Sequence, residues 1–410
     1  MTGPQLERRL GLVDAVVIGL GSMIGAGIFV ALAPAAQAAD SGLLAGLAVA
    51  ASVAYCNATS SARLAARYPQ SGGTYVYGRE RLGEFWGYLA GWGFVTGKTA
   101  SCAAMALTVG YYAWPEFAHV IAVATVVILT AVNYVGVQRS ALATRLAVAV
   151  VLVVLALVVV VVFTSGASDL TRLQAGARLG GVLQSAGILF LAFAGYARIA
   201  TLGEEVRDPA HVIPRAIPLA LSITLVVYAA VAVAALSALG SDGLARATAP
   251  LADAVAAAGV PALTPVVRVG AAVAAAGSLL VLILGVSRTT LAMARDRFLP
   301  HGLSAVHRRF NMPHRADVAV GILVATVAAV SDVRGAVGFS SFAVLTYYAV
   351  ANAAAWTLGR RLIPAAGLAG CLVLAFALPA TSVLSGAAVL AVGAAIYGWR
   401  RLLIRRRELR

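Results

Sequence analysis

Long apolar segments follow one another along almost the whole chain, and only short polar stretches separate them. A hydrocarbon core about 30 Å thick needs about 20 helical residues to cross it, so each segment predicts a membrane-spanning helix. The pattern therefore predicts an all-α integral membrane protein with about twelve transmembrane helices. The predicted spans cover residues 11–38, 42–67, 83–113, 117–135, 141–164, 181–205, 214–239, 262–294, 316–331, 335–358, 362–378 and 380–399.

The arginines of the loops set the predicted orientation. With the N-terminus inside, most of them lie on the inner flanks of the spans, as the enrichment of cytoplasmic loops in basic residues requires. The exceptions, on the outer flanks, are Arg172, Arg178, Arg246, Arg268 and Arg334. We therefore expect a multi-pass protein of the cytoplasmic membrane with both termini in the cytoplasm. Residues 1–10 form its N-terminal segment, and residues 400–410 form a basic C-terminal segment.

Composition supports embedding in a lipid bilayer. Hydrophobic residues make up 61% of the 410 residues, charged residues make up 11%, and mean hydropathy is +0.91. The inner loops account for the formal net charge of +15, so we expect no nucleic-acid partner. Cys56, Cys102 and Cys371 all fall inside apolar spans, so neither a disulfide framework nor a zinc site is predicted. We expect no metal and no other cofactor.

The first span carries the signs of a broken helix. Gly19, Gly21, Gly25 and Gly27 fall within nine residues, and each glycine costs a helix about 1 kcal/mol relative to alanine. Irregular backbone at membrane depth is tolerated only where it lines a protected cavity. Free N–H groups at the start of the second half-helix suit an anion and free carbonyls suit a cation, so a break here suits a zwitterion. A helix-packing face of small residues is the alternative.

The first span is much longer than the apolar core of a secretory signal, about 7–15 residues, and we expect it to be retained as a helix. The sixth span is also interrupted, because Gly195 follows Phe193 and precedes Tyr196. The two interrupted spans are five helices apart, and a repeat of five helices inserts its two copies in opposite orientations. Matching interruptions of this kind are the best sequence indication of a transporter site.

The stretch Ile24-Gly25-Ala26-Gly27-Ile28-Phe29 resembles the first-helix signature of the amino acid–polyamine–organocation (APC) superfamily. Further agreeing stretches, in the expected order, are Pro69–Tyr75, Asn133–Val137, Phe193–Tyr196, Glu204-Glu205, Asp208-Pro209, Ile213–Ile217, Ala292–Asp296 and Leu299-Pro300. The resemblance implies a leucine-transporter-type fold with broken helices 1 and 6. Residues 11–164 and 181–358 would form the two inverted repeats of five helices, and residues 362–399 would form two peripheral helices.

The resemblance also implies a substrate site. Carried over residue by residue, the substrate carboxylate falls on the backbone N–H groups of Gly25, Ala26 and Gly27. The substrate ammonium falls on backbone carbonyls near Met23, Leu191 and Ala194. An amino acid is the partner that these two half-sites imply.

Phe193 and Tyr196 are candidates for an aromatic gate or pocket wall, and ordinary helix packing is the alternative. The chain departs from the family pattern at two positions. Many members carry a glutamate after the aromatic of the sixth helix, where this chain has Ala197. Some proton-coupled members carry a lysine in the fifth helix, where the nearest equivalent here is Val151.

Lys98 is an ionisable residue that could replace the glutamate and the lysine missing from these two positions. It lies near the middle of the third span and is the only lysine of the chain. A desolvated lysine can lose its proton near cellular pH, whereas arginine stays charged. Intramembrane ionisable residues are by default functional candidates, so we assign Lys98 to proton coupling. The resemblance implies that its position in the third helix faces the substrate pocket. A structural lysine that donates to the carbonyls of the broken helices is the alternative.

These features predict a secondary active transporter that takes up amino acids, with protons as the coupling ion. A lysine in the pocket favours neutral over cationic substrates. An exchanger of amino acids or amines with the same fold is the alternative. The sequence shows no nucleotide-binding motif of an ATP-driven pump, no repeated polar ring of a channel, and no convergent catalytic set of an enzyme.

Overall fold

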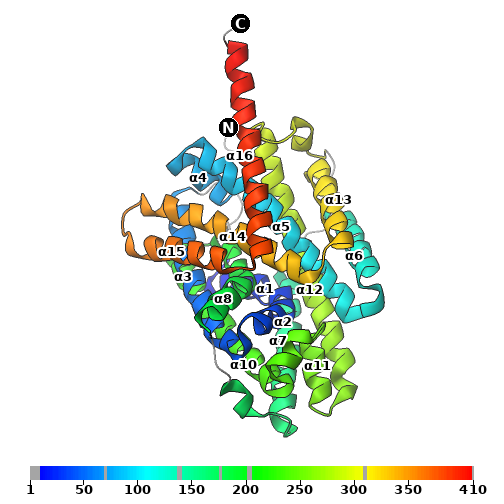
Figure 1. Cartoon of the computed structure of the whole chain (residues 1–410). Coiled ribbons are helices and arrows are strands. Elements are labelled where there is room, and N and C mark those ends of the chain that lie inside the picture. The colour runs from blue at the N-terminus through cyan, green and yellow to red at the C-terminus, as the bar shows by residue number, and fades with distance from the viewer. Residues whose placement is uncertain are drawn as a thin grey trace.

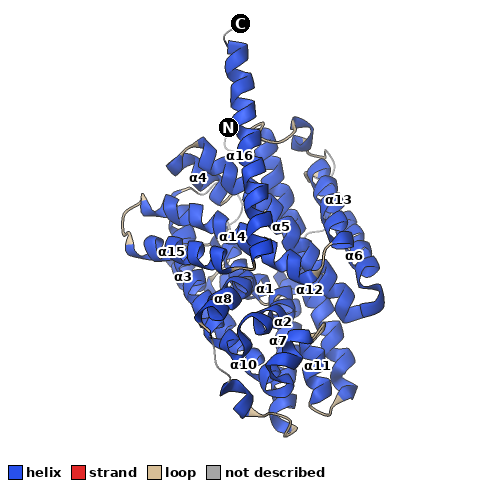
Figure 2. Cartoon of the chain, viewed as in Figure 1, coloured by secondary structure: helices blue, strands red, loops and turns tan. Residues whose placement is uncertain are grey.

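The computed structural model describes residues 10–68, 72–135, 141–174, 178–200, 206–307 and 312–408. Within these ranges the chain is almost wholly helical, and the only β contact is an isolated bridge between Leu10 and Val206 (Figure 2). The motif residues Pro69–Ser71, Gly136-Val137 and Glu204-Glu205 lie outside the described residues.

The helices occupy the predicted apolar segments. Two short helices, α4 and α11, lie between these segments and were not predicted. The α-helices are α1 Leu12–Met23, α2 Ala26–Ala39, α3 Leu43–Arg67, α4 Thr74–Leu82, α5 Glu84–Ala113, α6 Ala118–Tyr134, α7 Ala141–Thr164, α8 Leu179–Phe193, α9 Ala197–Ala200, α10 Pro209–Arg246, α11 Pro250–Ala257, α12 Thr264–Arg295, α13 His314–Val330, α14 Val333–Trp356, α15 Leu362–Ala377 and α16 Ala380–Glu408.

Eight helical stretches among the described residues are long and apolar enough to cross a membrane. These stretches are Gly27–Arg67, Pro115–Tyr134, Arg145–Thr164, Leu179–Ile199, His211–Arg246, Pro261–Arg295, Val333–Trp356 and Ala380–Leu402. Helices α1 and α15 are apolar but shorter. A chain with this many candidate spans is a multi-pass membrane protein.

The broken first span lies in the middle of the helical assembly. Helix α2 packs against α8 and α10, and α1 packs against α10 and α7; Figure 1 shows α1, α2 and α8 near the centre. Helix α5 packs along both α12 and α14. The interior is formed mainly by alanine, valine and leucine, with buried tyrosines at several helix contacts. This packing surrounds the breaks of α1–α2 and α8–α9 with other helices.

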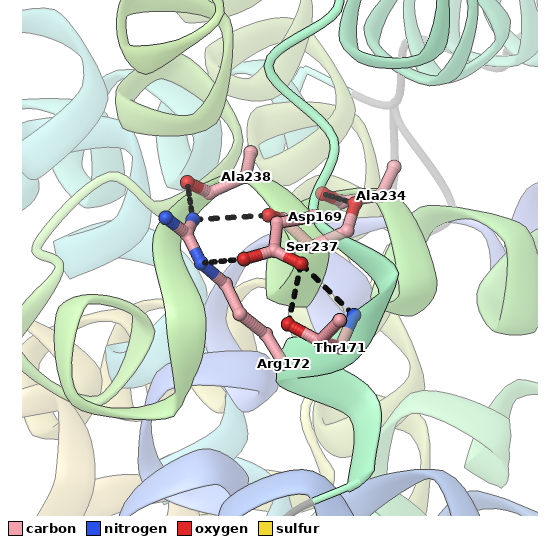
Figure 3. Close-up of polar contacts among 6 residues, drawn as sticks. All are labelled: Asp169, Thr171, Arg172, Ala234, Ser237 and Ala238. Carbon is pink, nitrogen blue, oxygen red and sulfur yellow. Dashed lines mark hydrogen bonds and ion pairs between the residues drawn. The ribbon is translucent and has the colours of Figure 1, made fainter.

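The C-terminal part of α10 is kinked at Gly240, whose φ of 68° lies in the left-handed region. The 3₁₀ helix η3, Leu170–Gln174, packs against the last turn before this kink. One guanidinium nitrogen of Arg172 donates to the carbonyls of Ser237 and Ala238, at 3.0 and 2.6 Å (Figure 3). The segment after α7 therefore caps carbonyls that the kink would leave without partners.

Asp169 orients this cap. Its carboxylate lies 3.5 Å from Nε of Arg172, and it accepts hydrogen bonds from the hydroxyl and the backbone N–H of Thr171 (Figure 3). These hydrogen bonds hold the pKa of Asp169 below its ordinary value. The backbone N–H of Asp169 adds a hydrogen bond of 3.2 Å to the Ser237 carbonyl.

Candidate functional site

The predicted break in the first span is confirmed, and it falls at Ile24 and Gly25. Helix α1 ends at Met23, Ile24 has φ −79° and ψ 62°, and Gly25 has φ −118° and ψ −138°. Ala26 and Gly27 are the first two residues of α2, which has no side-chain cap. The N–H groups of a first helical turn have no carbonyl partner within their helix. Of the three N–H groups in the predicted anion half-site, those of Ala26 and Gly27 therefore have no carbonyl partner within α2, whereas that of Gly25 donates to the Met23 carbonyl.

The sixth span is broken as well. Helix α8 ends at Phe193, and the 3₁₀ turn η4, Ala194–Tyr196, connects it to α9. A Cβ atom on Gly195 would lie 2.1 Å from the carbonyl oxygen of Ser22 in α1. A Cβ atom on Gly27 would lie 2.6 Å from Cα of Ala192 in α8. Glycines therefore let the two breaks pack directly against each other.

A small cavity of about 20 Å³ lies where the two breaks meet. Its lining includes four predicted site residues, Met23, Gly25, Gly27 and Leu191, and this places them together. The other lining residues are Ser22, Val30, Ser101, Ala104, Met105, Ala192 and Ser278. This volume holds about one water molecule, whereas small-molecule pockets occupy about 300–1,000 Å³. We call this arrangement of the helices the closed conformation, because its cavity is too small for a small-molecule ligand.

Tyrosine hydroxyls bind backbone carbonyls at both breaks. The Met23 carbonyl accepts hydrogen bonds from the Tyr228 hydroxyl at 2.5 Å and from the Gly25 N–H at 2.8 Å. The Tyr228 hydroxyl also lies 3.2 Å from the Ala192 carbonyl. The Tyr348 hydroxyl donates to the Ala194 carbonyl at 3.4 Å. In this conformation the carbonyls predicted to bind an ammonium group therefore already have hydrogen-bond donors.

Phe193 and Tyr196 do not line the cavity. Both side chains are fully buried. The Phe193 ring packs on Tyr228 and the Tyr196 ring packs on Tyr348, each pair with centroids 5.3 Å apart. Ala194 lies outside the lining as well. These three residues form the packed layer behind the cavity in the closed conformation.

Lys98 is buried in α5, with 7% of its surface exposed. It does not line the cavity, but Ser101, three residues later, does. Its nearest titratable neighbour is Cys102, one turn along the helix. Within the described ranges, no carboxylate forms an ion pair with Lys98. The structure therefore places an unpaired amine about one helical turn from the cavity.

Polar contacts close the assembly on the predicted outer side. Arg334, at the start of α14, hydrogen-bonds the Gln37 side chain at the end of α2. Its other terminal nitrogen donates to the Ala245 carbonyl at 2.5 Å. A second cavity of about 210 Å³ beside this contact is lined partly by Gln37, Gln184 and Arg334. Arg334 therefore connects the ends of α2, α10 and α14 above the closed site.

A second set of contacts closes the predicted inner side. Asp296, directly after α12, accepts hydrogen bonds from the Tyr75 hydroxyl and from Arg79 of α4, the latter at 2.6 Å. Asp14 of α1 forms an ion pair with Arg145 of α7. Burial and the Asp296 carboxylate both raise the pKa of Tyr75, so the phenol stays protonated and donates to the carboxylate.

The site includes residues that the sequence analysis missed. Ser101 and Ser278 contribute hydroxyl groups to the cavity lining, and Tyr228 binds the Met23 carbonyl. The available sequence signal was weak: each is a polar residue inside an apolar span. The positions of these three residues relative to the helix breaks depend on how the helices pack.

Comparisons with known proteins agree with this geometry. The family model "Amino acid permease" matches residues 14–363. The chain is 71% identical, over 98% of its length and 93% of the relative's, to an uncharacterized transporter of Mycobacterium tuberculosis. It is 28% identical to the cationic amino acid transporter 7 of Arabidopsis thaliana, covering 86% of the chain and 66% of the relative. It is 26% identical to a branched-chain amino acid permease of Bacillus subtilis, covering 78% of the chain and 74% of the relative.

Proposed function

The chain belongs to the amino acid permease family, and from this premise we propose that it takes up amino acids by secondary active transport. Family membership makes it a transporter rather than an enzyme. The observation that carries the proposal is the cavity between the two helix breaks, because Gly25 and Gly27 of one and Leu191 of the other line it. Broken helices that meet inside a helical assembly provide half-sites for both charged groups of an amino acid.

In the proposed bound state, the N–H groups of Gly25, Ala26 and Gly27 hold the substrate carboxylate. The positive end of the α2 dipole adds to this attraction. The substrate ammonium donates to the carbonyls of Met23, Leu191 and Ala194. At Met23 and Ala194 it replaces the hydroxyls of Tyr228 and Tyr348, and at Leu191 it replaces the Ala194 N–H. Tyr228 and Tyr348 therefore act as stand-in donors in the closed conformation and move aside on binding, while Phe193 and Tyr196 form the wall behind the substrate.

We favour neutral amino acids as substrates. Lys98 lies about one helical turn from the cavity without a carboxylate partner, and a desolvated cationic side chain beside it would be repelled. The Bacillus subtilis relative is named for branched-chain amino acids, which supports this choice. The Arabidopsis relative is named for cationic amino acids and supports the opposite one, so the experiment must compare both classes.

Lys98 is the proposed proton carrier. Its ammonium form, buried about one helical turn from the cavity, stabilises the closed conformation, and loss of its proton towards the cytoplasm removes that stabilisation. An unpaired charge at membrane depth costs about 2.5–3.5 kcal/mol or more. Each conformation of the transporter therefore favours either the charged or the neutral form of the Lys98 amine. A gradient of one pH unit is worth about 1.4 kcal/mol, or about tenfold accumulation of substrate per proton.

The proposed architecture retains twelve spans in the cytoplasmic membrane, with both termini in the cytoplasm. Residues 11–164 and 181–358 form the inverted repeats, and residues 362–399 form the peripheral pair. The ion pair of 3.0 Å between Arg401 of α16 and Glu84 of α5 is in line with the proposed order of spans, because it places the end of α16 and the start of α5 on the same side.

Uptake of labelled amino acids into proteoliposomes tests the function. Neutral amino acids should accumulate when the outside is acidic, without substrate inside the vesicles. Uptake that requires internal substrate and ignores the pH gradient would instead identify the exchanger. Absence of transport for neutral, cationic and acidic amino acids under both conditions would overturn the proposal.

A further inference from the structure

A second group of buried polar atoms lies away from the cavity, where α6, α12 and α13 meet. Asp317, in the first turn of α13, has no exposed surface. Neither of its carboxyl oxygens has a hydrogen-bond partner among the described residues. Nδ1 of His314 and Oγ1 of Thr130, on α13 and α6, are also buried without partners. This junction therefore contains a buried carboxyl group whose oxygens accept no hydrogen bond from the described residues.

The neighbours of Asp317 leave its carboxyl group unpaired. Ser287 of α12 lies beside it, but the serine hydroxyl donates to the Ile283 carbonyl at 2.9 Å. The nearby charged or titratable groups are the exposed Arg288 of α12 and His314, and neither bonds the carboxyl oxygens. On the other packed elements, α6 contributes Tyr134, whose ring lies 6.1 Å from that of His314. The segment before α13 contributes His307, whose ring lies 5.4 Å from that of His314.

Burial decides the protonation state of Asp317. A carboxylate ion removed from water without a hydrogen-bond donor or a cation is far less stable than the neutral acid in the same place. The neutral acid still lacks an acceptor here, but it has no charge to desolvate. Burial therefore favours the neutral acid of Asp317 in the closed conformation.

Asp317 and Lys98 border the same interface. Lys98 lies beside Cys102 on α5, and Cys102 packs in one apolar cluster with Val320 of α13. Asp317 precedes Val320 by three residues and so lies on the same face of its helix. Asp317 is also in the first turn of α13, at the end that we place towards the cytoplasm. It therefore lies at the cytoplasmic end of the interface that Lys98 borders.

We propose that Asp317 is the site from which the coupled proton leaves to the cytoplasm, an inference that rests on the proposed proton coupling. In the closed conformation Asp317 holds the proton as a neutral acid. When the inner ends of α6, α12 and α13 separate, its O–H bond breaks and the proton passes to Nδ1 of His314 or to entering water, then to the cytoplasm. The remaining carboxylate pairs with Arg288 until the site closes and takes up the next proton.

Infrared spectroscopy of the purified protein in lipid reads the protonation state directly and without transport. The C=O stretch of a neutral carboxylic acid lies apart from the bands of ionised carboxylates. At pH 7 the wild type should show this band, Asp317→Asn should lose it, and Asp317→Glu should keep it at a shifted frequency. Asp332→Asn is the matched control, because Asp332 also lies at a helix start but is exposed and accepts a hydrogen bond of 3.0 Å from the Gly335 N–H. The carboxylic acid band should persist in this variant.

Transport then tests the role of the proton. Asp317→Asn is permanently neutral and should exchange substrate at equal pH while losing acceleration by an acidic outside. A wild type without the acid band, or an Asp317→Asn variant with unchanged gradient dependence, overturns the proposal. If the wild type itself ignores the gradient, the proton-coupled function fails, whereas the infrared band still reports the protonation of Asp317. If Asp317→Asn does not fold, Asp317→Glu carries both measurements, and its band and gradient dependence must then change together.

Discussion

Substitution of Gly25 by alanine tests whether closing of the cavity brings the first helix break against α12. A Cβ atom on Gly25 would lie 1.9 Å from Oγ and 3.0 Å from Cβ of Ser278. Rotation of the serine hydroxyl removes the first clash but not the second, because carbon atoms pack best at about 3.5–4.0 Å. Helices α2 and α12 must therefore separate by roughly 0.5–1 Å in the closed conformation.

Overpacking of this kind costs about 1–3 kcal/mol. The cost arises only when the cavity is closed, so it weakens the closed conformation, which has no room for substrate, by about 5- to 150-fold relative to the open one. Gly25→Ala should therefore lower the melting temperature of the substrate-free protein, which thermal unfolding of the purified protein measures.

Two further variants make the result decisive. Gly25→Ala with Ser278→Gly should recover the melting temperature, because the next atom near the new Cβ is the Ala274 carbonyl oxygen at 3.9 Å, an ordinary contact. Gly285→Ala is the matched control in α12, since its Cβ would have no neighbour within 4 Å, and it should melt as the wild type does. A wild-type melting temperature in Gly25→Ala, or a double variant as unstable as the single one, would refute the steric reasoning.

Other expectations concern coupling, substrate choice and the tyrosine donors. Lys98→Ala should exchange substrate with little dependence on pH, and accumulation that still follows an imposed pH gradient would show that Lys98 is structural. Excess arginine should inhibit uptake of a labelled neutral amino acid only weakly, and strong inhibition would identify a cationic substrate class. Tyr228→Phe leaves the Met23 carbonyl with one donor fewer, which should destabilise the closed form by about 1 kcal/mol; an unchanged melting temperature and affinity would contradict this role.

The break in the first helix was predictable because its cause is local. Glycines clustered over a few residues weaken a helix wherever the helix lies, and the break is found within that cluster, at Ile24 and Gly25. The short helices α4 and α11 escaped prediction because each has fewer than ten residues. A segment that short, outside the long apolar runs, gives little periodic signal.

The cavity partners were not predictable because they depend on tertiary packing. Ser278 and Tyr228 come from spans far along the chain, and only the packing of α10 and α12 against the first break brings them to it. The special position of Asp317 could not be predicted for the same reason. In the sequence it is an acidic residue near a span end, and only its complete burial distinguishes it. Lys98 could be identified from the sequence because it is the single lysine of the chain, whereas its distance from the cavity wall could not.

The burial of Lys98 also has a consequence for chemical labelling. The side chains of this protein offer one primary amine, and the closed conformation leaves 7% of that residue exposed. Acylating reagents and aldehyde fixatives should therefore find almost no lysine to modify while the protein stays closed. Once the assembly opens, the reagent should modify Lys98, and the proteolytic peptide that contains Lys98 should gain the mass of the added group. The rate of this modification would measure the frequency of opening in unlabelled, unmutated protein.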